Sequence, residues 1–78
     1  MIILDTHIWI WWINQTLNRL SNEVIKRIEQ EQIIAISAIS YFEVAWLAAH
    51  KRIIIEIPIQ EWITQATENA GIVTELIL

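Results

Sequence analysis

The fold is decided by the opening stretch of the chain, Met1-Ile2-Ile3-Leu4-Asp5-Thr6-His7, which continues as Ile8-Trp9-Ile10-Trp11-Trp12-Ile13. A short apolar run predicts a buried strand that ends at Asp5, and a second apolar run after it is spaced as a helix. Asp5 carries the only formal charge in the stretch. A carboxylate in apolar surroundings is costly to bury without a partner. Open α/β sheets build ligand sites at the carboxyl ends of their strands, so partners of Asp5 are expected there.

Length and composition indicate one small domain. The chain has 78 residues, of which 55% are hydrophobic and 18% are charged, and this balance argues against disorder. It has no cysteine, which excludes disulfides and thiolate metal sites and fits a cytoplasmic protein. The net charge is −4 with five Lys plus Arg, so bulk electrostatics would not hold a nucleic acid. If RNA is the substrate, the acidic residues are expected to bind a metal.

The apolar pattern predicts alternating strands and helices. Ser21 is the expected N-cap of the second helix, and Gly71 stands where a left-handed residue closes a helix. The isoleucines of 53–57 fit either an edge strand or a loop that plugs the core. The other expected elements are strands over 1–4, 33–37 and 72–76, and helices over 6–13, from Ser40 to about His50, and over 59–70. This order, β-α-α-β-α-α-β, predicts an α/β fold with a parallel sheet of about three strands and helical crossovers.

Two isolated carboxylates, Asp5 and Glu43, follow the ends of the first two predicted strands. The carboxyl ends of parallel strands share one rim, so the two could converge there and hold Mg²⁺ or Mn²⁺, which favour oxygen ligands. Local roles are the alternative. Asp5 fits the N-cap of the next helix, and Ser40 with Glu43 fits the S-x-x-E capping box.

Other polar and aromatic residues have structural interpretations beside functional ones. Thr6 is suited to bind a metal-coordinated water or a phosphate, and equally to cap a helix. His7 lacks a second histidine at ligand spacing, which favours a structural or surface role. His50 lies at a predicted helix end beside Lys51 and Arg52, which favours a helix-end role over catalysis. The tryptophans alternate with Ile and Leu at helical spacing, which favours core or interface packing over stacking on bases.

The sequence resembles the PIN-domain family, and more narrowly the VapC toxins of bacterial type II toxin–antitoxin pairs. The residues that carry the resemblance span nearly all of the chain. They are Asp5-Thr6-His7, Trp11-Trp12, Ile36-Ser37-Ala38-Ile39-Ser40-x-x-Glu43, Arg52-Ile53, Pro58, Glu61-Trp62 and Ala70-Gly71-Ile72.

The resemblance implies an α/β/α sandwich and an endoribonuclease that depends on Mg²⁺ or Mn²⁺ and is inhibited by a cognate antitoxin. It implies that Asp5 and Glu43 are the catalytic, metal-coordinating acids and that Thr6 supports them. Further acids of the family site are absent, because no aspartate follows Glu43. Leu47 and Lys51 stand where relatives often carry lysine and glycine. We therefore expect residues 1–78 to be the N-terminal portion of a single PIN-like domain, weakly active or inactive alone.

Partners and alternative functions follow from the same features. The expected partners are an RNA substrate, a cognate antitoxin and other copies of the chain, because a three-stranded remnant would expose the first strand and one apolar sheet face. No apolar run approaches the roughly 18–20 residues of a membrane span, so no membrane role is expected. The alternatives to a nuclease are a non-catalytic module that binds an antitoxin or a PIN-domain partner, and the product of a decayed gene.

Overall fold

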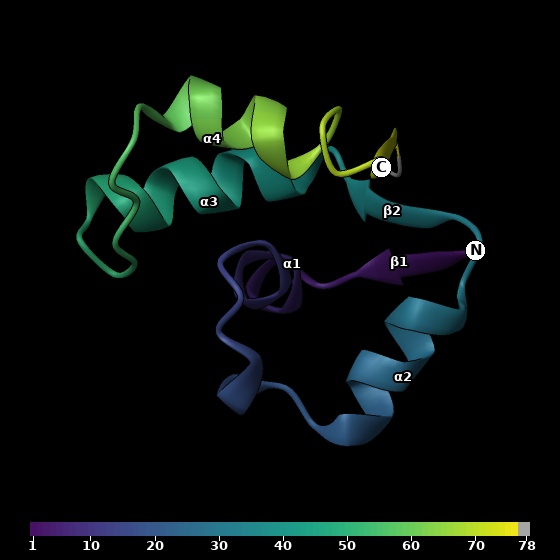
Figure 1. Ribbon diagram of the computed structural model, residues 1–78. Helices are drawn as coiled ribbons and strands as arrows, with labels where there is room; N and C mark the ends of the chain where they lie inside the picture. The colour runs from purple at the N-terminus through teal and green to yellow at the C-terminus, as the bar shows by residue number, and fades with distance from the viewer. Residues whose placement is uncertain (77–78) are drawn as a thin grey trace.

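A computed structural model describes residues 1–76 of the chain. Figure 1 shows the helices arranged around a small sheet, with α3 lying along α4. The elements are β1 (Ile2–Leu4), α1 (Thr6–Ile13), a 3₁₀ turn η1 (Leu17–Arg19), α2 (Asn22–Gln30), β2 (Ile34–Ser37), α3 (Ile39–Ala49), α4 (Ile59–Ala66) and β3 (Val73–Glu75). The predicted α/β class and element order are confirmed, and η1 is an addition that the sequence pattern did not indicate.

The sheet is parallel, with the strand order β1-β2-β3. Ile3 pairs with Ala35 of the central strand, and Ala35 pairs in turn with Val73. Parallel neighbouring strands must be joined by crossover connections. The helices α1 and α2 connect β1 to β2, and α3 and α4 connect β2 to β3. The carboxyl ends of β1 and β2 therefore lie at the same edge of the sheet, where Asp5 and the start of α3 follow.

The two faces of the sheet differ. On one face Leu4, Ile36 and Ile72 are buried in the core. On the other face the row Ile3–Ala35–Val73 leaves two apolar side chains open, with Ile3 43% and Val73 45% exposed. Ala35, in the middle of this row, is fully buried, so the expected uncovered apolar face is met at the two edge strands of the described sheet but not at its central strand.

Trp9 is the centre of the helical part of the core. Its side chain is fully buried, and its indole packs edge-on against Trp62 and Tyr41, with ring centroids 5.0 and 6.2 Å away. Its Nε1 donates a hydrogen bond of 3.0 Å to the carbonyl oxygen of Ala66, in the last turn of α4. A buried indole N–H needs such a partner, so this bond fixes α1 against α4 as well as satisfying the donor.

Two helices end in Schellman turns closed by residues other than glycine. Gln15 after α1 and Lys51 after α3 both have positive φ, 57° and 56°. After α3, the amide of Lys51 donates to Ala48 O and that of Arg52 donates to Leu47 O, at 3.2 and 2.8 Å. This pair of bonds defines the motif, in which glycine is the usual residue.

The end of α4 differs from the prediction. The helix stops at Ala66 and not at Ala70, because Thr67 leaves the helical region with φ −121° and ψ −81°. Gly71 has the predicted left-handed conformation, φ +70°, but it closes the turn that follows and leads into β3.

The segment 53–57 is a loop and not an edge strand. Its isoleucines 53, 55 and 57 pack against the core, while Ile54 is 83% exposed. Within residues 1–76, no helix is long and apolar enough to cross a membrane.

Candidate metal and nuclease site

Asp5 immediately follows β1 and caps α1. Its backbone is extended, and its Oδ1 accepts a hydrogen bond of 2.9 Å from the amide of His7. The His7 Nδ1 lies 3.9 Å from the same oxygen, and the Asp5 side chain is 69% exposed. The capping role weighed for Asp5 is therefore confirmed. One carboxylate oxygen is used by the cap, and the exposed side chain remains accessible to a ligand.

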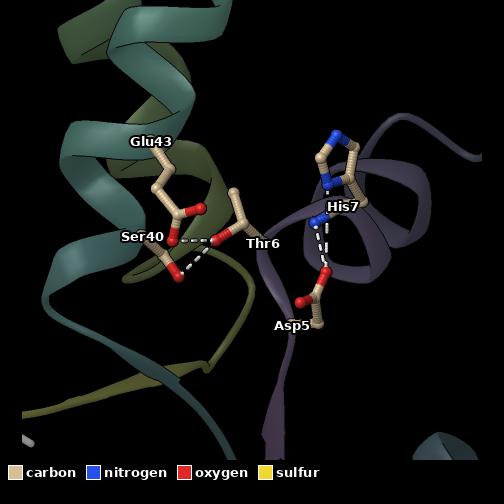
Figure 2. A network of polar contacts seen from close by, with 5 residues as sticks. All are labelled: Asp5, Thr6, His7, Ser40 and Glu43. Carbon is tan, nitrogen blue, oxygen red and sulfur yellow. Dashed lines mark hydrogen bonds and ion pairs between the residues drawn. The ribbon is translucent and has the colours of Figure 1, made fainter.

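Thr6 links α1 to α3. Its side chain is buried, and its Oγ1 donates a hydrogen bond of 2.9 Å to Glu43 Oε1. The same hydroxyl lies 2.8 Å from Ser40 Oγ. A hydroxyl has a single proton, so with Thr6 donating to Glu43 the Ser40 hydroxyl must donate to Thr6. Figure 2 shows this chain, with Thr6 between the Glu43 carboxylate and the cap of α1.

The capping-box interpretation of Ser40 and Glu43 is wrong. The helix α3 begins one residue earlier, at Ile39, and its N-cap Ala38 has no capping side chain. Ser40 thus lies inside the first turn, where its buried hydroxyl bonds to Thr6. The sequence predicted a capping role for Ser40. Its actual partner, Thr6, lies 34 positions away, where a local motif cannot indicate it.

The structure brings Asp5 and Glu43 to the same region through Thr6. Glu43 contacts the residue that directly follows Asp5, although the two acids come from α3 and from the end of β1. Both acids are exposed. Within residues 1–76 there is no group of three or more His, Cys, Asp or Glu residues that could hold a metal ion.

This donor set fits one kind of metal ion. Mg²⁺ commonly binds through one or two carboxylates and keeps several of its waters, whereas Ca²⁺ uses a larger cage of protein oxygens. Two exposed carboxylates match the first arrangement. They also predict weak binding, because few protein ligands replace the hydration shell.

An open apolar groove of about 700 Å³ adjoins Glu43 and is also lined by His7, Phe42 and Trp46. Phe42 is 79% and Trp46 51% exposed. The ring of His50 stacks on Trp46 with centroids 4.1 Å apart, and its Nδ1 lies 2.9 Å from Trp46 O. His50 thus caps the end of α3, away from the acids, in line with the helix-end role expected for it.

Comparison with known proteins points to one family. Residues 2–75 match the family model of the PIN domain. The chain is also 40% identical over 68 residues to a protein named Ribonuclease VapC22 from Mycobacterium tuberculosis, a match that covers 87% of this chain and 52% of that relative. The chain thus spans about half the length of the curated relative it matches. No solved structure matches the chain.

Proposed function

Because the chain belongs to the PIN-domain family, we propose that it is the N-terminal portion of a VapC-like ribonuclease in which Asp5 and Glu43 bind Mg²⁺ or Mn²⁺. The observation that carries the proposal is the hydrogen bond from Thr6 to Glu43. Because Thr6 directly follows Asp5 in the chain, this bond holds the Glu43 carboxylate beside the neighbour of Asp5. Its reaction is the hydrolysis of an RNA phosphodiester bond, and its place of action is the cytoplasm, where RNA is available.

Each residue of the site has a definable task. Asp5 presents a carboxylate whose direction is set by its bond to the His7 amide. Thr6 and Ser40 form a hydrogen-bond chain that ends on Glu43, so this carboxylate is oriented before any ligand arrives. Such orientation lowers the entropic cost of binding. The metal, when bound, supplies a Lewis acid that polarises the phosphate and activates the attacking water.

A metal site with only two carboxylates is expected to give weak nuclease activity at most. They leave most of the coordination sphere of the metal to water, so metal affinity and turnover by residues 1–78 alone are expected to be low. Further ligands would come from the remainder of a PIN-like domain, which is why we interpret the chain as one portion of a single domain.

An RNA cleavage assay with added Mn²⁺ tests the proposal. We expect slow cleavage that EDTA abolishes and that drops at least tenfold in Asp5→Ala and in Glu43→Gln. Glu61→Gln is the matched control, because it removes an exposed carboxylate from α4. Cleavage that survives both Asp5→Ala and Glu43→Gln would rule out the proposed site.

A second proposed function is the binding of a cognate antitoxin along α3. Ile39, Phe42 and Trp46 are 60%, 79% and 51% exposed and lie at helical spacing on that helix. Large exposed apolar patches of this kind often mark protein interfaces. Co-purification with the small product of a neighbouring gene should be lost in Phe42→Gln/Trp46→Gln. The control Ile54→Gln, which removes another exposed apolar side chain from a loop, should leave it unchanged.

We also propose that the chain self-associates through the open sheet face. Ile3→Thr/Val73→Thr replaces both exposed residues of that face by a β-branched polar residue that suits a strand. Size-exclusion chromatography should show the parent chain as oligomers and this variant shifted towards the monomer. A parent chain that elutes as a monomer at all concentrations would contradict self-association.

A further inference from the structure

A second groove, of about 690 Å³, is also lined by His7. Its walls come from the second half of α1, from the turn that contains Arg19, and from the segment after α3 that contains Lys51 and Arg52. His7 and Leu47 line both grooves. The second groove therefore adjoins the surface that carries Glu43.

The charges of this groove differ in sign from those of the chain as a whole. Three of the five Lys and Arg residues line it, namely Arg19, Lys51 and Arg52, while none of the nine Asp and Glu residues does. The chain as a whole carries −4. A local cluster of cations on an acidic protein focuses potential on one site and favours an anionic ligand.

The three cations of the groove are unpaired among the described residues. Within residues 1–76, the lysine and arginine side chains form one ion pair with a carboxylate, between Arg27 and Glu31 on α2. Arg19, Lys51 and Arg52 are exposed. Lys51 and Arg52 follow the C-terminal end of α3, where positive charges stabilise the helix dipole. That role does not explain why Arg19 of η1 lines the same groove.

The groove also contains aromatic surface. Trp11 and His7 both line it, with ring centroids 5.9 Å apart and planes inclined by 52°. Unpaired bases stack on such rings while cations hold the phosphates, which is the usual combination in sites for single-stranded nucleic acid.

We propose that this groove binds the sugar–phosphate backbone of single-stranded RNA through Arg19, Lys51 and Arg52, with a base stacked on Trp11. The inference rests on the proposed nuclease function, and it names the surface that leads the substrate past His7 to Asp5 and Glu43. A polymer is favoured over a free phosphate because the cations come from two separate segments and the same groove is lined by the rings of Trp11 and His7.

The test is fluorescence anisotropy of a labelled single-stranded RNA of about a dozen nucleotides, in EDTA so that no metal binding or cleavage is involved. The test variant is Lys51→Asn/Arg52→Gln, in which Asn suits the left-handed conformation at position 51. The matched control is Lys26→Gln/Arg27→Gln, which removes the same charge from exposed positions on α2.

We expect the test variant to bind at least about tenfold more weakly at low salt. The slope of log K against log[salt] should become shallower by about 1.4, or about 0.7 per lost contact with a single strand. Arg19→Gln should make the slope shallower by a further ~0.7. The control variant should change affinity by less than twofold.

Equal losses in the two double variants would overturn the proposal, because they would indicate bulk electrostatics. Competition by inorganic phosphate as effective as that by RNA would also overturn it, in favour of a small-anion site. RNA binding that persists in Asp5→Ala while cleavage is lost supports both the groove and the nuclease. RNA binding by a chain with no cleavage under any metal supports the groove and removes the nuclease function.

Discussion

Thr6 donates a 2.9 Å hydrogen bond to Glu43 across 37 positions of sequence. Through this bond Thr6, the first residue of α1, supports an acid on α3, and its buried hydroxyl holds Glu43 against the residue that follows Asp5 in the chain. Because that hydroxyl also accepts from Ser40, its removal affects both the site and the packing between the two helices.

Asp5 can be tested separately as a cap and as a metal ligand. Asp5→Asn should leave the free energy of unfolding within about 0.5 kcal/mol of the parent, because Asn caps as well as Asp, whereas Asp5→Ala should cost about 1 kcal/mol. Both variants should bind Mn²⁺ at least tenfold more weakly in calorimetric titration.

A matched control for the cap is Ser21→Ala, which removes the cap of α2. It should lower stability by a similar amount and leave Mn²⁺ binding unchanged. An Asp5→Asn variant that retains the parent affinity for Mn²⁺ would exclude Asp5 as a ligand.

Removal of the Thr6 hydroxyl should destabilise the protein. Thr6→Val keeps the shape of the side chain but leaves the buried Ser40 hydroxyl without its acceptor, at a cost of about 1–3 kcal/mol. Ser40→Ala should cost less, and the double variant less than the sum of the two, because it leaves no orphaned group. Chemical denaturation of the four proteins measures this coupling.

Thr6→Ser distinguishes the structural role of the hydroxyl from its role at the site. It retains the donor to Glu43, so Mn²⁺ affinity should stay close to that of the parent, while Thr6→Val should weaken it. Equal Mn²⁺ affinity in Thr6→Ser and Thr6→Val would show that Glu43 does not depend on Thr6 for its orientation.

The Schellman turn after α3 should be stabilised by glycine. Lys51 adopts φ +56°, and a non-glycine residue in that region is strained by about 1–2 kcal/mol. Since glycine also gains freedom in the unfolded chain, Lys51→Gly should stabilise the fold by ~0.5 kcal/mol, or a few degrees in Tm.

The reciprocal variant is Gly71→Ala, which should lower stability by about 1 kcal/mol. A Cβ at position 71 would meet no atom within 4 Å, so any loss must come from the backbone conformation, φ +70°. Thermal melts followed by circular dichroism measure both variants. A Lys51→Gly variant with a lower Tm would contradict the strain at this position.

Stability should depend on Glu31 at acidic pH. The bond to the Met1 amine, followed by the bond to Arg27, lowers the pKa of Glu31 in the folded chain below its ordinary value. The stabilisation from a lowered carboxyl pKa is complete above the unfolded value of about 4.3 and is lost as pH falls through the folded value.

Glu31→Gln should therefore lower Tm at pH 7 and converge with the parent below about pH 4, in melts recorded across this range. Arg27→Gln is the matched control, and it should give a smaller shift because the amine of Met1 is the larger influence on Glu31. An unchanged pH profile in Glu31→Gln would show that the Met1–Glu31 pair contributes nothing to stability.

The features that sequence predicted best are those set by local pattern. The apolar runs that end at Leu4 and Ser37 gave strands, and their separation by helical segments gave parallel pairing. The cap at Ser21 also needed only neighbouring residues. Such features follow from side-chain period and backbone preference, which a single sequence records.

The features that sequence missed depend on contacts between distant segments or on strain. Ser40 and Glu43 fit the local S-x-x-E motif of a capping box. The actual partner of Ser40 is the buried hydroxyl of Thr6, which the pairing of β1 with β2 brings close to it. Gln15 and Lys51 adopt a conformation that glycine normally marks, so composition gave no signal for either turn. For the site, sequence predicted the two acids, while the hydrogen-bond chain from Ser40 through Thr6 to Glu43 required the fold.

The bond between Trp9 and Ala66 determines when this chain can fold during its synthesis. The two residues are 57 positions apart, so Trp9 waits on the order of 3–10 seconds for its partner at ordinary rates of translation. During that interval the apolar stretch around Trp9 has emerged while the segment that completes its burial has not been made. The helix that carries Asp5 at its cap therefore completes its packing only after most of the chain has been made.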